Sequence, residues 1–299
     1  MFSHPQRASS ALLALCGVIV ALVAVPVQAR AEEDGFAAEF FSYLPAPPDI
    51  KLPDIAIEGF WTGDLKKAKR AYRSGDYGRA RKYFEKASED GNIVADWYLG
   101  HMSRLGRGGP QDDAAAFSYY SRVADAFSDD ETDDKRLKIT VDALVQVADY
   151  YRLGSRAAAI KQDYPRAMRI YKLTATFGHP AAQFALGLMH LRGQGIESSP
   201  KQGLKWLFTS ARKRYAPAEA ELGELYWHGN FVRSDRTRAL MWYILAKETA
   251  KPDETPQIFD RLDDMLAEAS DEERLEAEAR ATVWADQYPA KGATQASAE

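Results

Sequence analysis

The sequence predicts an all-α protein, an α-solenoid in which pairs of helices repeat along the chain. Four segments share the pattern Ala-x(3)-[Leu/Val]-[Gly/Ala]-x(5)-Gly, and a second helix type alternates with them. A Pro-rich stretch ends before this helical pattern begins. Because repeats of this kind cannot bury their apolar faces alone, we expect stacked helix pairs that share one continuous core.

The first helix type is defined by a small residue in the middle of the helix. The central residues are Gly100, Ala148, Gly187 and Gly223, each preceded by Leu or Val and followed six residues later by a glycine. A glycine inside a helix costs about 1 kcal/mol relative to alanine, so it is tolerated where a neighbouring helix must approach closely. We therefore expect these small residues to form a packing seam.

The second helix type reads apolar-x(2)-[aromatic/Leu]-x(3)-Ala, and its spacings of three and four place these residues on one helix face. Gly91 and Gly178 follow two of these helices as left-handed caps, and Tyr215 takes that place after a third. With the aromatic helix first in each pair, the predicted pairs are Tyr77–Leu105, Asp112–Leu153, Tyr164–Arg192 and Pro200–Trp227, and a fifth begins at Asp235 and continues with Gln257–Ala269.

The first thirty residues have the features of a secretory signal peptide. Arg7 precedes an unbroken apolar run over residues 11–25, and Ala29 or Ala31 ends a small-residue cleavage pattern. The run is short for a bilayer-spanning helix, and an uncleaved anchor is the alternative. Cys16, the single cysteine of the chain, lies in this run. We expect a periplasmic protein without disulfides and with no transmembrane segment after cleavage.

Composition and a capping signal divide the chain into five parts. Ser270 and Glu273 form a capping-box signature at the start of the last helix. Residues 128–134 form an acidic loop within the second repeat. The expected parts are a signal peptide (1–29), a Pro-rich, partly disordered lead-in (30–63), the repeat solenoid (64–250), C-terminal capping helices (251–288) and a disordered tail (289–299).

No motif for catalysis, a cofactor or a metal stands out. The acidic loop lacks the glycine and the ligand spacing of a calcium-binding loop, and there is no nucleophile elbow or phosphate-binding loop. A formal net charge of −4 excludes the strongly basic footprint of nucleic-acid binding. We predict a protein that is not an enzyme. The four histidines after the signal peptide do not have the spacing of metal ligands; they are His101, His179, His190 and His228.

Two units carry a resemblance to a known family. Residues 95–102, Ala-Asp-Trp-Tyr-Leu-Gly-His-Met, and residues 181–195, Ala-Ala-Gln-Phe-Ala-Leu-Gly-Leu-Met-His-Leu-Arg-Gly-Gln-Gly, resemble the Sel-one-like repeat, a relative of the tetratricopeptide repeat. The resemblance covers most of residues 64–250. It implies a right-handed solenoid whose Leu-Gly helices line a concave face, and it says little about function.

The order of features along the chain also resembles the ExoR-type regulators of alphaproteobacteria. The order includes the signal peptide, the acidic insertion, Ala-Asp-Tyr-Tyr-Arg-Leu-Gly at residues 148–154 and Met-Trp-Tyr-Ile-Leu-Ala-Lys at residues 241–247. In that family, the exported protein binds the periplasmic domain of a membrane sensor kinase and represses exopolysaccharide synthesis until proteolysis removes it. The resemblance implies a sensor kinase and a periplasmic protease as partners. The long Pro-rich lead-in departs from that layout.

The candidate partner-binding residues lie three before, one after and four after each central small residue. Mixed aromatic, Arg and acidic side chains are typical anchors of protein interfaces. Packing between repeats is the alternative for Trp97 and Phe184. Two other functions stay open, a non-signalling envelope scaffold and a glycan-binding protein. The candidates are Trp97, His101, Arg104, Asp149, Arg152, Phe184, Leu188, Glu224 and Trp227.

Overall fold

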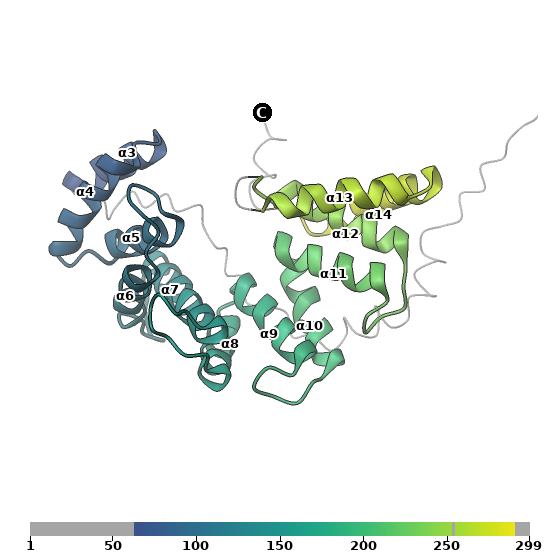
Figure 1. The fold of residues 1–299 in the computed structure, drawn as a ribbon, viewed down its shortest axis with the longest axis horizontal. Helices are drawn as coiled ribbons and strands as arrows, with labels where there is room; N and C mark the ends of the chain where they lie inside the picture. The colour runs from purple at the N-terminus through teal and green to yellow at the C-terminus, as the bar shows by residue number, and fades with distance from the viewer. Residues whose placement is uncertain (1–62, 253–254, 291–299) are drawn as a thin grey trace, which may run out of the picture. The chain divides into compact units, whose positions relative to one another are not determined.

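The computed structural model describes residues 63–252 and 255–290, which form twelve helices and no strand, so the predicted all-α repeat fold is confirmed. The predicted signal peptide, the lead-in up to residue 62 and the tail from residue 291 lie outside the described residues. None of the described helices is both long and apolar enough to cross a bilayer. The helices follow one another along the chain in Figure 1. They are α3 (Gly63–Arg73), α4 (Tyr77–Glu89), α5 (Ile93–Leu105), α6 (Asp113–Ala124), α7 (Asp134–Leu153), α8 (Tyr164–Thr176), α9 (Pro180–Arg192), α10 (Pro200–Ala211), α11 (Ala216–His228), α12 (Arg236–Thr249), α13 (Pro256–Glu268) and α14 (Asp271–Gln287).

Each Leu-Gly helix packs most closely against the aromatic helix that follows it. The hairpins are α5 with α6, α7 with α8, α9 with α10 and α11 with α12, and the paired helices lie side by side in Figure 1. The predicted pairing, with the aromatic helix first, was therefore wrong by one helix. Periodicity marks the apolar face of each helix but does not say which neighbour covers that face most closely.

The central glycines explain this pairing in three hairpins, because Gly100, Gly187 and Gly223 each lie against a large side chain of the partner helix. A Cβ atom added to Gly100 would lie 2.7 Å from Cε1 of Tyr120, and one added to Gly187 would lie 2.7 Å from Cδ2 of Leu207. Tyr120 and Leu207 have no exposed surface. The predicted seam therefore exists, and it fixes the distance between the two helices of a hairpin.

The junction between α10 and α11 differs from the equivalent junctions. Gly91 and Gly178 adopt positive φ angles of 77° and 75° before α5 and α9, as predicted. Before α11, this position holds Arg214 with a φ of 56°, and not Tyr215. Left-handed backbone is unfavourable for a residue with a side chain. The buried guanidinium offsets that cost, because it donates hydrogen bonds to Glu219 at 2.8 Å and to the Leu245 carbonyl oxygen at 3.2 Å.

The stack ends in α13 and α14. The predicted capping box is present, since the Ser270 hydroxyl accepts a hydrogen bond from the backbone of Glu273, whose carboxylate accepts one from the backbone of Ser270. The Trp284 ring of α14 packs edge to face on Trp242 of α12, with centroids 4.7 Å apart. A terminal element of this kind covers apolar surface that a further repeat would otherwise bury.

Replacing Gly223 with Ala should destabilise the protein. The new methyl group would lie 2.7 Å from Cε2 of Tyr243 and 3.2 Å from the carbonyl oxygen of Ala239, so the ring must move. Overpacking of this kind costs about 1–3 kcal/mol in the free energy of unfolding, which urea denaturation measures. Gly78→Ala is the control, because a Cβ at Gly78 meets nothing within 4 Å. Equal effects of the two substitutions would argue against the seam.

Candidate functional site

The candidate residues lie on corresponding faces of α5, α7, α9 and α11, and most of them contact another helix. Of the nine, only Arg104 is exposed; Leu188 is buried and the other seven are partly buried. The structure gathers several of them around two carboxylates. We call these groups the Asp142 cluster (Trp97, His101, Asp142 and His179) and the Glu224 cluster (Glu224, Trp227, His228, Arg236, Tyr243 and Arg261).

The Asp142 cluster joins three successive repeats. The indole Nε1 of Trp97 on α5 donates a hydrogen bond to Oδ2 of Asp142 on α7 at 2.6 Å. Nε2 of His179, the residue before α9, lies 3.3 Å from Oδ1. Nε2 of His101 lies 3.4 Å from Oδ2, and the His101 ring packs against the Trp97 ring with centroids 4.3 Å apart. These contacts fix the register between α5, α7 and the start of α9.

Sequence reasoning missed Asp142 and treated His179 as an isolated histidine. Asp142 precedes Asp149 by seven residues, so the two lie on one face of α7, and this spacing is the signal that could have identified it. Burial by itself would raise the pKa of Asp142, but the interactions with His101 and His179 outweigh burial and hold the pKa well below its usual range. In the described residues, no group of three His, Cys, Asp or Glu side chains is placed to hold a metal ion.

Asp149 and Arg152 form a triad with Tyr171 inside the α7–α8 hairpin. The Tyr171 hydroxyl donates a hydrogen bond to Oδ1 of Asp149 at 2.6 Å, and Nε of Arg152 donates to the Tyr171 oxygen at 3.2 Å. Burial and the Asp149 charge raise the pKa of Tyr171, so this phenol stays protonated. The triad therefore holds α7 against α8, and it leaves only the outer parts of Asp149 and Arg152 in contact with solvent.

Phe184 and Leu188 on α9 serve packing. The Phe184 ring contacts the Tyr215 ring at the start of α11, with centroids 5.8 Å apart. Leu188 is 5% exposed and so offers little surface to a partner. The alternative reading of Phe184, as a packing residue between repeats, therefore agrees with its contacts.

The Glu224 cluster joins α11 to α12 and α13. Oε1 of Glu224 accepts hydrogen bonds from the Tyr243 hydroxyl at 2.6 Å and from Nε of Arg261 at 2.8 Å, while Nε2 of His228 lies 3.0 Å from Oε2. Burial alone would raise the pKa of Glu224, but Arg261 and Tyr243 outweigh burial and lower it.

Trp227 lies between two cations of the same cluster. The guanidinium carbon of Arg236 lies 4.3 Å from the Trp227 ring centroid, and that of Arg261 lies 5.5 Å from it. Both distances are within the range of cation–π attraction. The indole is thus held in place, while part of its surface stays open to solvent.

Glu219 is the one described carboxylate whose pKa rises to about 7, mainly because of burial and against the influence of Arg214. A pKa near neutrality is typical of a catalytic acid or base. Glu219 has no exposed surface, however, and its oxygens face Arg214 at 2.8 Å and Thr249 at 3.4 Å. A substrate would have to displace these partners to reach it, so a structural role explains this residue.

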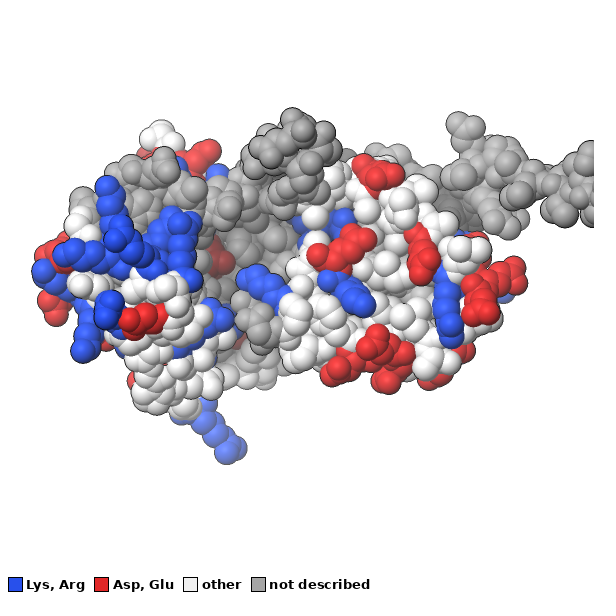
Figure 2. Space-filling view, turned by 90° about the horizontal axis from the view of Figure 1, so that it is seen from above, with Lys and Arg blue, Asp and Glu red and all other residues white. Residues whose placement is uncertain are grey.

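The surface charge differs between the two ends of the stack. In the view of Figure 2, Lys and Arg side chains gather over the N-terminal helices, on the left. In α3 and α4, the exposed cations that form no ion pair with a described residue include Lys66, Arg70, Arg73 and Lys82. Acidic residues dominate the last two helices instead; they are Asp260, Asp263, Asp264, Glu268, Asp271, Glu272, Glu273, Glu276, Glu278 and Asp286.

Asp142→Asn should lower the free energy of unfolding at pH 7 by about 1–3 kcal/mol, because it weakens hydrogen bonds to a partly buried group. Since the folded-state pKa of Asp142 is lowered, its contribution is fully present above the unfolded value near 4 and is lost as the pH falls below it. The free energy of unfolding, measured by urea denaturation, should therefore fall less between pH 7 and pH 3 in the variant than in the native protein. Asp129→Asn, at an exposed loop residue, is the control. An identical pH dependence in Asp142→Asn and the native protein would contradict this assignment.

Comparison with known proteins gives the family. An exopolysaccharide production negative regulator of Rhizobium leguminosarum bv. viciae is 32% identical over 184 residues, which cover 61% of this chain and 67% of that protein. A regulator of the same description from Rhizobium meliloti (strain 1021) is 28% identical over 205 residues, which cover 68% of this chain and 74% of the relative. The crystal structure of a Sel1 repeat protein from Oxalobacter formigenes is similar over 79% of this chain and 86% of its own, with 22% identity and a TM-score of 0.49.

The Sel1 repeat profile matches residues 69–92, 93–126, 141–179, 180–215 and 216–248. The last four of these segments match the hairpins α5–α6, α7–α8, α9–α10 and α11–α12 in order, except that residues 134–140 at the start of α7 and Thr249 at the end of α12 lie outside them. Their boundaries thus agree with the pairing observed in the structure. With its helices, its small-residue seam and its profile matches in agreement, this chain belongs to the Sel1 repeat family.

Proposed function

We propose that this chain is an exported, non-enzymatic regulator that binds the periplasmic domain of a membrane sensor kinase, restrains it and so represses exopolysaccharide production. The observation that carries the proposal is the similarity over 184 residues to a protein described as an exopolysaccharide production negative regulator. That similarity covers 61% of this chain and 67% of the relative. Sel1 repeats are a protein-interaction fold, which supports a protein as the partner.

The geometry of the candidate face supports binding rather than catalysis. Its carboxylates, Asp142, Asp149 and Glu224, are each held by Arg, His, Tyr or Trp donors, so they present a fixed surface. A pre-ordered surface loses little conformational entropy when a partner binds. Binding that favours the inactive conformation of a receptor shifts its population toward that conformation by the difference in affinity.

Release of the receptor would follow from loss of the regulator. The acidic loop before α7 is a candidate site for a periplasmic protease, although its ion pair between Glu131 and Arg136, at 2.9 Å, restrains it. The predicted lead-in is the second candidate, and it lies outside the described residues.

Deletion of the gene should increase exopolysaccharide per unit of cell mass and raise the transcription that the sensor kinase controls. Complementation with the whole chain should restore both. The purified periplasmic domain of the kinase should bind the purified chain in a pull-down with defined components. Unchanged exopolysaccharide and kinase output would rule out the regulatory proposal and favour an envelope scaffold. Retention on isolated exopolysaccharide, without binding to the receptor domain, would favour a glycan-binding protein.

Arg104→Glu should weaken repression, because Arg104 is the exposed candidate at the end of α5 and charge reversal opposes an acidic partner. We expect exopolysaccharide in the complemented deletion strain to rise toward the level of the uncomplemented strain. Arg233→Glu makes the same charge change at an exposed loop residue outside the candidate face and should leave repression intact. Thermal unfolding and immunoblotting check that both variants fold and accumulate. Full repression by Arg104→Glu would exclude this end of the face from the interface.

A further inference from the structure

One of the four turns inside the hairpins differs from the other three. The turns over residues 106–112, 193–199 and 229–235 each have seven residues, whereas the turn between α7 and α8 has ten, residues 154–163. We call this segment the long turn. The extra residues are not needed to close a hairpin of this family, because seven suffice at the three equivalent positions.

The long turn has a defined structure. Ser155 and Ile160 form an isolated antiparallel bridge, with hydrogen bonds of 2.9 Å and 2.8 Å between their backbones. The Ser155 hydroxyl donates a hydrogen bond to Oδ2 of Asp113 on α6 at 3.0 Å. The amide of Gln162 donates to the Arg152 carbonyl oxygen at 2.9 Å. The segment is thus anchored to the preceding hairpin and to α7.

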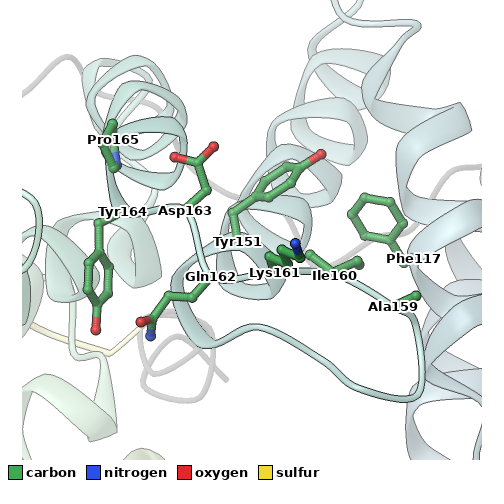
Figure 3. Close-up of a pocket in the computed structure, with 9 residues that line it drawn as sticks. All are labelled: Phe117, Tyr151, Ala159, Ile160, Lys161, Gln162, Asp163, Tyr164 and Pro165. Atoms are coloured by element: carbon green, nitrogen blue, oxygen red, sulfur yellow. The ribbon is translucent and has the colours of Figure 1, made fainter.

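The long turn forms one wall of a pocket of about 570 Å³ (Figure 3). This volume is within the range of about 300–1,000 Å³ typical of ligand sites. Phe117 of α6 and Tyr151 of α7 line it with their rings 5.9 Å apart and nearly perpendicular. Tyr164 and Pro165 line it from the start of α8. The pocket therefore offers an apolar floor between two hairpins.

The surroundings of the pocket are positively charged. Lys161 lines the pocket, and the Arg166 guanidinium lies 4.1 Å from the Tyr151 ring centroid. Arg156 lies in the same turn, and Arg169 lies one turn along α8 from Arg166. All four side chains are exposed and form no ion pair with a described residue. The carboxylate that lines the pocket, Asp163, instead accepts a hydrogen bond from the Arg166 backbone at 2.9 Å.

The long turn also offers backbone hydrogen-bonding groups. Lys161 and Gln162 lie between the bridge and α8, in a segment without helix or turn. Their backbone N–H and C=O groups form no hydrogen bond with the backbone of any described residue. Such groups can pair with an extended peptide, while adjacent pockets accept its alternate side chains. This favours a peptide strand over a sugar chain as the occupant.

We infer that this pocket binds an extended acidic segment of a partner protein, which packs one aromatic or large apolar side chain against the Phe117 and Tyr151 rings and places its carboxylates near Lys161 and Arg166. The inference rests on the proposed function, because it supplies a docking point for the protein partner. None of the nine candidate residues lines this pocket.

A peptide titration tests the inference directly. The probe is fluorescein-labelled Glu-Asp-Phe-Glu-Asp, added to the whole 299-residue chain and followed by fluorescence anisotropy. It should bind at least about tenfold more tightly than Gln-Asn-Phe-Gln-Asn and than Glu-Asp-Ala-Glu-Asp. Raising the salt concentration to about 1 M should weaken binding, because the charges are exposed. No preference among the three peptides, or tighter binding of an oligogalacturonate than of the acidic peptide, would overturn the inference.

Two variants locate the binding site. Lys161→Glu reverses a charge at the pocket and should weaken peptide binding by at least about tenfold. Removal of residues 157–159 shortens the long turn to seven residues and should abolish binding, while the far-ultraviolet circular dichroism of the helices stays unchanged. Arg233→Glu is the matched control and should bind as the native chain does. Peptide binding that survives both pocket variants would exclude this site.

Repression of exopolysaccharide in the complemented deletion strain separates the two proposals. If the native chain represses exopolysaccharide but does not prefer the acidic peptide over its controls, the pocket proposal is excluded and the proposed function is unaffected. Specific peptide binding at the pocket, in a protein whose deletion does not change exopolysaccharide, would support the pocket and sink the proposed regulatory role.

Discussion

The close approach of two helices at a small residue is the constraint on which the stack depends. At Gly100, Gly187 and Gly223, no side chain separates the Leu-Gly helix from the ring or branched side chain of its partner. Tyr120 and Leu207 are consequently buried completely, and Tyr243 is nearly so. A hairpin made in this way still has an apolar outer face, which only the next hairpin or a terminal helix can cover. The seam therefore sets both the hairpin and the need for a stack.

Polar groups fix the position of neighbouring helices relative to one another within this apolar packing. Apolar contacts alone tolerate sliding of one hairpin against the next, whereas a partly buried carboxylate is stable only when its donors reach it. Asp142 takes donors from α5 and from the start of α9, and Glu224 takes them from α12 and α13. Each carboxylate thus fixes the relative position of three helices. We interpret these clusters as devices for a single arrangement of repeats and not as sources of net stability.

The contacts within the fold limit which polar groups the candidate residues could offer to a partner. The polar side-chain atoms of Trp97, Asp149 and Glu224 form hydrogen bonds with neighbouring helices. Arg104 is exposed, and the cations around the long turn form no ion pair with a described residue. Because these groups are cations, a complementary partner surface carries acidic residues.

Local pattern was sufficient for the helices, their small-residue seam and the capping box of α14, because each depends on residues within a few positions of one another. The sequence proposed a candidate face, but it did not predict the contacts that its residues make. Asp142 lies 45 residues from Trp97 and 37 from His179, so no local pattern connects them. Nor did the sequence distinguish an exposed Arg104 from a partly buried Arg152, since both lie four residues after the central small residue of their repeat.

By itself, the sequence determined that this protein is a stack of helix pairs, because helical periodicity and small central residues are properties of single segments. Only the tertiary structure decided which helix pairs with which, how Arg214 replaces a glycine, and where the long turn makes a pocket. The physical reason is that these features depend on side chains from separate hairpins. Their energies arise from burial and hydrogen bonds that exist only after the repeats have packed.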